Sequence, residues 1–587
     1  MQIVDRNKVI GYTPQAYGEY AALLNVDLVE SSHTRDMYRL TIEQRYQSKP
    51  LYIKWKLPAK GIRGAWTTNS VLDKRFKTDW ELPSLHSSIS NDAPIISLFG
   101  HNDENIMTLA CSDLVDYIPI EASLREEDNH FYFVIHLFTQ HRVIGDYESA
   151  IIIDRSPDHF SHVVQRLSLW SVDSSNLSTR GSLPHLAQTP LYSTWYSFHQ
   201  NLNEERLLSE CHLTKSLGYD LIIVDDGWQT RDDKRGYDYT GDWRNERFED
   251  VASFVRNVHQ MDMGIMFWYA VPFCGKKSDA YHRFKGKFLT EFHPWAPVFD
   301  PRYPEVRRYL VDIYVNAVTA WQLDGFKLDF IDAFKVYPDT EQGLLEGRDT
   351  ISVSDGVFLL IQDIAQALLA INPDVLIEFR QQYISPALQI LGNMYRAFDC
   401  PNDSVMNRVR TTDVKLICGN SAVHSDMITW SPQEDIEVAA LQFSSILFSV
   451  PQLSVPLDQR SDEELAMISF FTNYWRAHKS ILMGGVFTAF KPLSNYPILS
   501  AIADDKAIIG IYDDVVIPLT VSHQSMDIIN GKLSKSVFID CRADLGSWAY
   551  KIKNCMGQLI QKDKIDLSHK LHKVECPANG IIFLEKL

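Results

Sequence analysis

The alternation of apolar and polar residues along the chain changes character twice, and each change predicts a domain boundary. In residues 1–187, short runs such as 37–43 and 131–137 alternate apolar and polar positions, and clusters of Asn, Asp, Gly and Pro separate them. A period of two is typical of strands with one buried face, and the separating residues are typical of turns. This segment is therefore predicted to be an N-terminal β-sandwich domain.

Residues 188–485 have a different pattern, in which apolar strand-like runs alternate with longer helical stretches. The runs at 221–224 and 264–268 have strand character, whereas 304–321 and 356–371 have the period of amphipathic helices. Regular alternation of strand and helix indicates a parallel sheet, either closed into a barrel or doubly wound. The middle of the chain is thus predicted to be an α/β domain.

Beyond residue 485 the helical period disappears. Runs at 507–512, 515–519 and 580–584 again have strand character. We predict a smaller C-terminal antiparallel β-sandwich over residues 486–587, and we find no internal repeat.

The charge of the chain argues against two kinds of partner. It has 57 Lys and Arg residues against 75 Asp and Glu residues, a net charge of −18. Nucleic acids and anionic membranes both require a cationic surface, so neither is expected as a partner, whereas a neutral small molecule is compatible with this charge. Residues 1–18 lack an apolar core of secretory length and no run approaches the length of a membrane span, so we expect a cytoplasmic protein.

The eight cysteines give no sign of a metal site. They lie at positions 111, 211, 274, 400, 418, 541, 555 and 576, without the paired spacing of zinc ligands. We interpret them as mostly free, buried thiols, and Cys400, which follows Asp399, as a packing residue. No metal and no cofactor is predicted.

The candidate chemistry lies at the ends of the predicted strands of the middle domain. Lys327 and Asp329 are two positions apart in an apolar strand, so their side chains lie on the same face. A cation there keeps the acid ionised, as a glycosidase nucleophile requires if a second, protonatable carboxyl group is supplied from elsewhere. Asp399, after a later strand that ends near Arg396, is the candidate for that second group. An ordinary ion pair or helix cap is the alternative.

Other predicted strands end in residue types that bind sugars. Asp225, Asp226 and Trp228 follow the second strand, where carboxylates accept hydrogen bonds from hydroxyl groups and the ring offers an apolar face; turn-forming acids are the alternative. Trp268 ends the third strand, either at a sugar or in the core. Arg302, in a loop before a helix, has the chemistry to hold a hydroxyl group or a carboxylate.

Four segments in this order carry a resemblance to a known family. They are Asp-Asp-Gly-Trp at 225–228, Gly-Asp-Trp at 241–243, Asp-x-Arg-x-Pro-Glu-Val at 300–306 and Lys-x-Asp-Phe at 327–330. Together they resemble the catalytic barrel of glycoside hydrolase family 36, the melibiase-type α-galactosidases, which also includes plant raffinose and stachyose synthases. The resemblance covers about residues 190–485. It implies a central (β/α)8 TIM-type barrel over residues 188–485 with β domains on both sides.

The resemblance also implies roles for the candidate residues. Asp329 would be the nucleophile, with Lys327 contacting both it and the sugar. Asp225 and Asp226 would accept hydrogen bonds from the 4- and 6-hydroxyl groups of a galactosyl unit. Trp268 would line the same subsite and Arg302 would lie close to the nucleophile.

The acid/base is assigned from a second, shorter match. Arg396, two residues and then Asp399 resemble the Arg-Ala-Ser-Asp of the synthase branch, which makes Asp399 the acid/base. Asp403, four residues later, is its rival for this role. Arg380, Arg396 and Asp403 are also predicted to contact substrate.

One segment departs from the family pattern. Many bacterial members carry a cysteine and a glycine-rich run after the fifth strand, near the 2-hydroxyl group, where this chain has Arg-Gln-Gln-Tyr at 380–383. Long side chains there narrow or re-polarise that wall of the subsite. The N-terminal β domain is also shorter than in the larger members.

The resulting expectation is a retaining, exo-acting α-galactosidase that removes terminal α-linked galactose from small oligosaccharides through a covalent glycosyl-enzyme. The alternatives are an α-N-acetylgalactosaminidase or other α-glycosidase, a galactosyl-transferring synthase, and a sugar-binding protein on a decayed barrel. A homo-oligomer is possible, since the flanking β domains offer surface for contacts.

Overall fold

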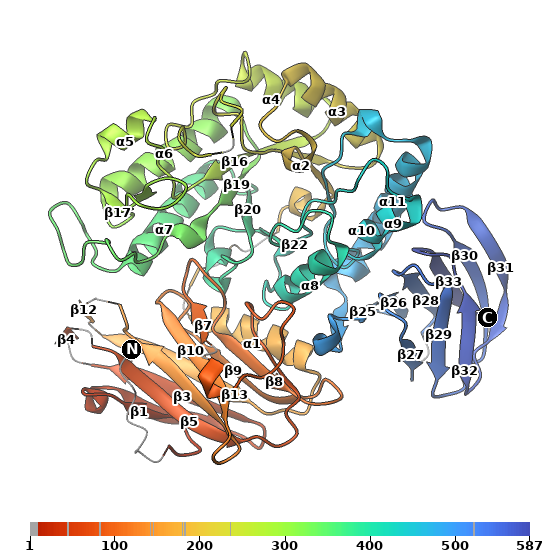
Figure 1. The fold of residues 1–587 in the computed structure, drawn as a ribbon, viewed down its shortest axis with the longest axis horizontal. Coiled ribbons are helices and arrows are strands. Elements are labelled where there is room, and N and C mark those ends of the chain that lie inside the picture. Colours follow the sequence, from red (N-terminus) through yellow and green to blue (C-terminus); the bar gives the residue numbers. More distant parts are fainter. Residues whose placement is uncertain are drawn as a thin grey trace.

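The computed structural model describes residues 10–587 except 44–45, 48, 82–83, 141–142, 145, 176, 179, 181–182, 235 and 521–522. The expectation that the chain begins without a secretory segment rests partly on residues 1–9, which lie outside the described residues. Three parts follow one another along the chain, with two β domains flanking a barrel (Figure 1).

The N-terminal part is a sandwich of two antiparallel sheets. One sheet has the order β1 (Gln15–Tyr17), β5 (Leu51–Pro58), β11 (His130–Leu137), β10 (Ile118–Arg125) and β7 (Ser84–Ser87). The other has the order β2 (Asn25–Ser31), β3 (Arg35–Ile42), β13 (Tyr147–Asp154), β9 (Asn105–Cys111), β8 (Ile95–Phe99) and β6 (Gly64–Trp66). Every second residue of β11 is buried, so the predicted period of two places Phe131, Phe133 and Ile135 between the sheets.

The middle part is a barrel of eight parallel strands. In spatial order they are β14 (Leu191–Ser193), β15 (Leu221–Val224), β16 (Gly264–Ala270), β19 (Gly325–Asp329), β20 (Leu376–Arg380), β21 (Met394–Arg396), β22 (Ala422–His424) and β23 (Gln452–Leu453). A parallel ladder joins β23 to β14, and parallel bridges from His424 to Val450 and from Ile428 to Leu453 complete the ring on the other side. The predicted (β/α)8 barrel is confirmed, and the doubly wound alternative is wrong.

The helices of the barrel begin and end close to the predicted positions. The longer ones are α3 (Glu204–Ser216), α4 (Val251–Gln260), α6 (Pro304–Trp321), α7 (Val353–Ile371), α8 (Ser404–Lys415) and α11 (Asp462–Gly484). α6 has the predicted bounds, because Pro304 stands at its first turn and Gln322 ends it in a left-handed conformation. α7 begins three residues earlier than predicted, where Ser352 caps it.

α7 is also the helix in the described part of the chain that is long and apolar enough to match a membrane span in length and composition. Its buried residues, among them Val357, Leu360 and Ile364, belong to the core of the barrel. It packs beside α6, as a barrel helix does.

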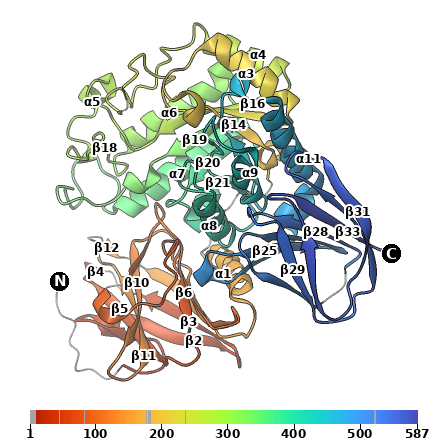
Figure 2. The same ribbon diagram turned by 45° about the vertical axis from the view of Figure 1, so that its right-hand side comes forward.

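The fifth strand has no α-helix after it. Between β20 and β21 the chain forms only the short 3-10 helix η5 (Pro386–Ile390). α1 (Phe160–Asp173), which follows the sandwich, contacts both η5 and strands β8 and β9, and its Ser168 donates a hydrogen bond to the carbonyl of Ile417. Figure 2 shows α1 between the sandwich and the barrel. The sandwich is therefore attached to the barrel beside its fifth and sixth strands.

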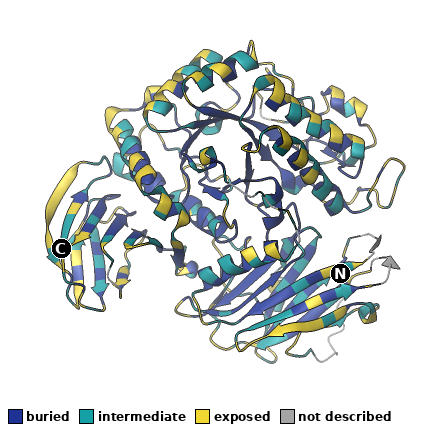
Figure 3. Ribbon diagram, turned by 180° about the vertical axis from the view of Figure 1, so that it is seen from behind, coloured by how far each residue is buried: buried dark blue, intermediate teal, exposed yellow. Residues whose placement is uncertain are grey.

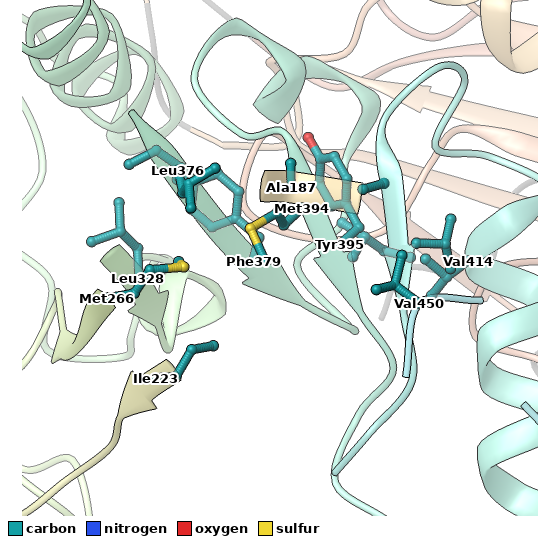
Figure 4. Packing of buried hydrophobic residues seen from close by; sticks show 14 of the residues in the cluster. Ala187, Ile223, Met266, Leu328, Leu376, Phe379, Met394, Tyr395, Val414 and Val450 are labelled. Atoms are coloured by element: carbon teal, nitrogen blue, oxygen red, sulfur yellow. The ribbon is translucent and has the colours of Figure 1, made fainter. Parts of the chain in front are cut away.

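Inside the barrel, side-chain alternation separates an apolar floor from a charged mouth. Ile223, Met266, Leu376 and Met394 face inward near the starts of their strands (Figure 4). Two positions further on, the same face of these strands carries Asp225, Trp268, Glu378 and Arg396. Figure 3 shows these strands as the buried centre of the molecule, with the exposed residues on the outer faces of the helices. The polar residues at the strand ends thus meet at one mouth, as predicted.

The C-terminal part consists of two sheets. The larger has the order β24 (Val486–Phe490), β25 (Ile498–Ala503), β26 (Lys506–Ile511), β28 (Ser525–Asn530), β33 (Ile581–Lys586), β30 (Ser547–Lys553) and β31 (Leu559–Asp566). The smaller contains β27 (Val516–Leu519), β29 (Ser536–Cys541) and β32 (Leu571–Glu575). Most neighbours are antiparallel, whereas β26 and β28, and β27 and β29, run parallel.

Candidate active site

Asp329 is the last residue of the fourth barrel strand and is almost completely buried. The register pairs Lys327 with Trp268 on one side and Glu378 on the other, so the inward faces of three neighbouring strands converge here. Phe330 takes a left-handed conformation, with φ 64°, and its amide donates to Oδ1 of Asp329 over 2.8 Å. The strand therefore ends in a turn that holds the carboxylate at the mouth.

Both oxygens of the Asp329 carboxylate accept hydrogen bonds. Arg380 Nε lies 2.8 Å from Oδ1 and the Tyr383 hydroxyl donates to the same oxygen, while Trp268 Nε1 donates to Oδ2 over 2.9 Å. Burial raises the pKa of Asp329, but Arg380 and Lys327, together with these donors, outweigh it and hold the pKa well below its usual range. The residue is ionised across the physiological pH range, as a carboxylate nucleophile must be.

Lys327 does not contact the nucleophile directly, which corrects the sequence prediction. Its Nζ lies 2.6 Å from Oδ2 of Asp225, and among the described residues this is its ion pair. The cation bonded to Asp329 is Arg380, from the segment that departs from the family pattern. Lys327 acts on the nucleophile only through the proximity of its charge.

Asp225 and Asp226 lie at the mouth, as predicted, and both are buried. Gln229 and Gln200 donate to the two oxygens of Asp226 over 2.7 and 2.9 Å. Burial raises the pKa of Asp226 to about 6, and the neighbouring charge of Asp225 adds to the effect. With Lys327, these residues form one polar wall beside the nucleophile.

Trp228 lies behind this wall, and the prediction that it contacts sugar is wrong. Its side chain is fully buried, it stacks on Trp243, and its Nε1 donates to the backbone carbonyl of Trp268 over 2.9 Å. The turn at Gly227, with φ 116°, directs Trp228 away from the mouth. Trp268, by contrast, reaches the nucleophile.

Arg302 is not among the described residues that donate a hydrogen bond to the Asp329 carboxylate, and its placement beside the nucleophile stays a prediction. It is fully buried, and its Nε and Nη2 each lie 2.8 Å from an oxygen of Asp300, to which Arg348 also binds. Its Nη1 donates to the carbonyl of Ile351. The motif at 300–306 therefore builds the loop before α6, where Asp300 and the carbonyl of Ile351 take three of the five N–H donors of Arg302.

Asp399 follows the sixth strand, and 41% of its side chain is exposed to solvent. The carboxylates of Asp225, Asp226 and Asp329 at the same mouth are buried. Arg396 holds Asp399 through Nη2, 2.9 Å from Oδ1, and binds Asp426 through Nη1. Burial raises the pKa of Asp399, but the charges of Arg396, Arg380 and Lys327 outweigh it and place the pKa below its usual range. The charge of Asp329 acts on it in the opposite direction, so the two carboxylates are close enough to interact.

Asp403 has a different role from the one predicted. It is the N-cap of α8, exposed to solvent, and its Oδ1 accepts a hydrogen bond from the amide of Met406 over 2.9 Å. A capping acid satisfies a free backbone donor of the helix. This role accounts for Asp403 without any part in the reaction, so Asp399 is the stronger candidate for the acid and the rival assignment stays a prediction.

Sequence reasoning missed three groups of the candidate site. Tyr383, which the sequence marks only as part of the unusual segment, donates a hydrogen bond to the nucleophile. Glu378 is fully buried between Arg396 and Gln452, and burial raises its pKa to about 7. Asp426 lies two residues after the seventh strand, where it binds Arg396 and accepts a hydrogen bond from the Tyr196 hydroxyl. The inward alternation of β20 is the signal that could have identified Glu378.

The sandwich contributes to the same region, which the sequence did not predict. The amide of Asp92 donates to the carbonyl of Gln382 over 3.1 Å, and Gln381 Nε2 donates to the carbonyl of Thr68 over 3.3 Å. Ser90 Oγ donates to the carbonyl of Phe334 over 3.0 Å. The first two bonds hold the segment that carries Arg380 and Tyr383, and the third holds the loop after Asp329. No group of three or more metal-ligating side chains is found within the described residues.

Comparison with solved structures gives a consistent result. The α-galactosidase of Lactobacillus brevis superposes with a TM-score of 0.66 over 94% of this chain and 80% of its own, at 13% identity. The glycoside hydrolase family 36 α-galactosidase AgaA of Geobacillus stearothermophilus gives a TM-score of 0.65, covering 94% of this chain and 81% of its own at 12% identity. The chain has the family 36 α-galactosidase fold.

Sequence comparison adds less. The resemblance drawn from the motifs is confirmed as a likeness of fold, but no family model matches the chain. A probable α-galactosidase C of Aspergillus flavus is 24% identical over an alignment of 167 residues, and the match covers 25% of this chain and 22% of that protein. The matching segment thus spans about a fifth of the length of this curated relative.

Proposed function

We propose that the protein is a retaining, exo-acting α-galactosidase. The observation that carries this proposal is the pairing of Asp329, buried and held ionised by Arg380, Tyr383 and Trp268, with the open carboxyl group of Asp399 on Arg396. An ionised carboxylate next to one that can exchange protons is the arrangement of glycosidases. The family 36 fold supports the choice of sugar, since solved relatives with this fold include AgaA variants in complex with raffinose and with stachyose.

In the first step, an oxygen of Asp329 bonds to the anomeric carbon as the bond from that carbon to the leaving oxygen breaks. The proton of Asp399 passes to the leaving oxygen, which departs as an alcohol. In the second step, Asp399 takes a proton from water, whose oxygen bonds to the anomeric carbon and frees Asp329. Two inversions give net retention.

Asp399 has to be protonated when the substrate arrives, although the cations around it favour ionisation. A bound sugar covers its exposed face and removes water from it, which raises the pKa. The polar wall of Asp225, Asp226 and Lys327 supplies acceptors and a donor for the hydroxyl groups of the sugar. We propose that this wall selects the galactosyl unit.

A differently specific enzyme is the second candidate, and one observation favours it. Arg380 and Tyr383 stand beside the nucleophile where the resemblance expects small residues. Their size changes the shape of that side of the subsite, and with it the group accepted at C2 of the sugar. An α-N-acetylgalactosaminidase and a galactosyl-transferring enzyme both remain candidates on this ground.

A panel of aryl α-glycosides that differ at C2 and C4 distinguishes these functions. We expect the α-galactoside to be cleaved at least ten times faster than the gluco, manno and 2-acetamido compounds. Faster cleavage of the 2-acetamido compound would favour the second candidate. Transfer of galactose to an added sugar in place of water would identify a transferase. If none of the compounds is cleaved, the sugar-binding function is favoured.

A further inference from the structure

Asp426, two residues after the seventh barrel strand, is a buried carboxylate to which the proposed reaction assigns no role. Its side chain is completely buried, whereas that of Asp399 is exposed. A buried carboxylate destabilises a protein unless cations or hydrogen-bond donors replace its lost water. The partners of Asp426 therefore indicate its role.

Both oxygens of Asp426 bind groups that hold Asp399. Oδ1 pairs with Nη1 of Arg396, whose Nη2 donates to the Asp399 carboxylate over 2.9 Å. Oδ2 accepts a hydrogen bond over 2.7 Å from the amide of Cys400, the residue that follows Asp399. Asp426 thus fixes Asp399 in two ways, through the guanidinium that binds its carboxylate and through the backbone next to it.

The stretch of chain that carries Asp399 has no regular structure of its own. Residues 397–403, between β21 and α8, belong to neither a helix nor a strand. The amide of Ala397 donates to the carbonyl of His424 over 3.1 Å, and the amide of Cys400 donates to Asp426. Both sides of Asp399 are therefore tied to the end of the seventh strand, which fixes the direction of its side chain.

Asp426 is itself held firmly. Its amide donates to Oδ1 of Asn407 over 3.0 Å, and Nδ2 of Asn407 donates to its carbonyl over 3.1 Å. Asn407 lies on α8, which packs beside β22 (Figure 1). Tyr196, on α2 (Trp195–Phe198), donates from its hydroxyl group to Oδ2 over 3.0 Å. Because every side-chain partner of Asp426 among the described residues is a donor, the ionised carboxylate is the form that this site binds.

The charge of Asp426 also acts on Asp399. Arg396 has three carboxyl neighbours, Glu378, Asp399 and Asp426, so its charge is divided among them. Burial raises the pKa of Asp426 and Arg396 lowers it, while the charge of Asp399 raises it again. Since the interaction between two charges is mutual, ionised Asp426 raises the pKa of Asp399 in turn. It thereby favours the protonated form that donates to the leaving oxygen.

Other charged and titratable groups surround this pair of carboxyl groups. They are Lys327, Asp329, Glu378 and Arg380 on or next to the neighbouring strands, Tyr196 on α2, and Cys400 and Arg410 in the chain after β21. Burial raises the pKa of Tyr196 and of Cys400 well above their usual ranges, so both keep their protons. Glu378, whose pKa burial raises to about 7, changes charge in the wild type as well as in variants of Asp426. A comparison of each variant with the wild type therefore reports on Asp426.

We propose that Asp426 is the positioning residue of the acid/base, which aims the carboxyl group of Asp399 at the leaving oxygen and takes part of the charge of Arg396. The inference rests on the proposed function. It goes beyond that function by assigning a role to a residue that acts through Arg396 and Cys400.

The test compares a substrate whose leaving group needs a proton with one whose leaving group does not. Asp426→Asn should lower kcat/KM for melibiose about 10- to 100-fold and leave kcat/KM for α-galactosyl fluoride within about threefold. The ratio of the two values does not depend on the fraction of the enzyme that is active. Asp563→Asn, at an exposed position of β31, is the matched control and should change neither value.

The pH dependence separates positioning from support of the fold. Without the negative charge at position 426 the pKa of Asp399 falls, so kcat/KM for melibiose should begin to decline about one pH unit lower than in the wild type. Asp426→Glu keeps the charge, and its decline should stay within about 0.3 pH unit of the wild type. A residue that only supports the fold would lower both substrates equally and leave the profile in place.

Several results would overturn the inference and leave the proposed function intact. They are equal losses on both substrates, no loss on either, and an Asp426→Asn profile parallel to that of the wild type. A folded wild type that cleaves neither substrate overturns the proposed function and this inference with it.

Thermal melting shows whether each variant is folded. If Asp426→Asn does not fold, Tyr196→Phe takes its place, because it removes one hydrogen bond to Asp426 and leaves the ion pair with Arg396. This variant should lower the ratio of kcat/KM for melibiose to that for the fluoride about threefold. An unchanged ratio overturns the inference.

Discussion

At the scale of single residues, the chemistry of the candidate site depends on how the Asp329 carboxylate is held. Arg380 is the ion-pair partner that touches it, and Trp268 and Tyr383 complete its hydrogen bonds. A buried carboxylate without these donors would be protonated more readily, because burial disfavours its charge. The departure from the family pattern at 380–383 thus has a definite physical role.

Removal of the guanidinium of Arg380 should make Asp329 titrate in an accessible range. Because Arg380 lowers the pKa of Asp329, Arg380→Ala should raise this pKa. In the pH dependence of kcat/KM for an aryl α-galactoside, the variant should then lose activity at acidic pH, where the wild type stays active. We expect a loss of about a hundredfold at pH 5. Arg380→Lys, which keeps the charge, should recover part of it. A pH profile parallel to that of the wild type would contradict this role.

The substitutions Asp399→Ala and Asp403→Ala separate the two carboxyl groups that competed for the acid role. Asp399→Ala should lower kcat on melibiose by about 10²- to 10⁴-fold, with a much smaller loss for a substrate whose leaving group needs no proton. Asp403→Ala should keep kcat and lose only about 1 kcal/mol of stability, since it removes a helix cap. The opposite order of activities would reassign the acid.

The pKa of Asp399 also predicts the pH dependence of the wild type. Arg396, Arg380 and Lys327 lower it against the effect of burial, so the protonated form that donates to the leaving oxygen becomes more abundant as the pH falls. Activity on oligosaccharides should therefore rise from pH 8 toward acidic pH, and less steeply on an activated aryl galactoside. An alkaline optimum on melibiose would contradict this.

Several of these residues were predictable from the chain, and others were not. Lys327 and Asp329 share a face because alternation in a strand is a local property. Trp228 and Arg302 lie in equally specific motifs, but which way a side chain turns after a strand depends on tertiary neighbours such as Trp243 and Asp300. Sequence therefore located the strand ends and could not tell a substrate contact from a residue that supports the loop.

At the scale of elements, β20 connects the residues around the nucleophile Asp329 with those around the acid/base Asp399. Its inward residues are Glu378, beside Lys327 in the register, and Arg380, beside Arg396. Glu378 thus lies between the cation near the nucleophile and the cation that holds the acid. The alternation of β20 places Glu378 and Arg380 on one face, but which residues of the neighbouring strands they meet depends on the register of the barrel.

Glu378→Gln should change the pH dependence of stability. Burial raises the pKa of Glu378 from 4.5 to about 7. Between these pH values the Glu378 carboxyl group is protonated in the folded protein and ionised in the unfolded chain. Its contribution to the free energy of unfolding therefore falls as the pH rises from about 4.5 to 7. Glutamine does not titrate, so the stability of the variant relative to wild type should rise over this range by up to about 3 kcal/mol. Chemical unfolding at pH 5 and pH 8 measures it, and a constant difference would contradict the assignment.

The helices show the same division between local and tertiary information. The bounds of α6 follow from its period and from Pro304, so the sequence predicts them. The absence of an α-helix between β20 and β21 does not follow from any local signal, because α1, which lies some 200 residues earlier in the chain, packs at that place. The three-part order was predictable, and the docking of the parts was not.

At the scale of the whole molecule, one carboxylate joins all three parts. Asp413 on α8 accepts a hydrogen bond from Trp66 over 2.8 Å and pairs with Lys74 over 3.1 Å, both from the sandwich. Tyr496, in the loop before β25, donates to it over 2.6 Å. Lys74 and Asp413 are both buried, so each depends on the other.

Asp413→Ala should destabilise the protein by about 3–5 kcal/mol, because it leaves the ammonium group of Lys74 buried without a counter-charge. Asp563→Ala, at an exposed position of β31, is the control and should change stability by less than about 0.5 kcal/mol. Scanning calorimetry should show the melting temperature fall for the first variant alone. Equal melting temperatures would mean that the three parts are held together elsewhere.

The cytoplasmic location and the homo-oligomer stay predictions.

The most direct test of the central claim is to trap the glycosyl-enzyme. A ring-fluorinated α-galactosyl fluoride reacts at the nucleophile and is released slowly, so the intact protein should gain the mass of one fluorogalactosyl group, located by peptide mapping to Asp329. Asp329→Asn should gain none and should lose at least about a thousandfold in kcat on an aryl α-galactoside. An adduct on another carboxylate, or none on an active wild type, would contradict the account.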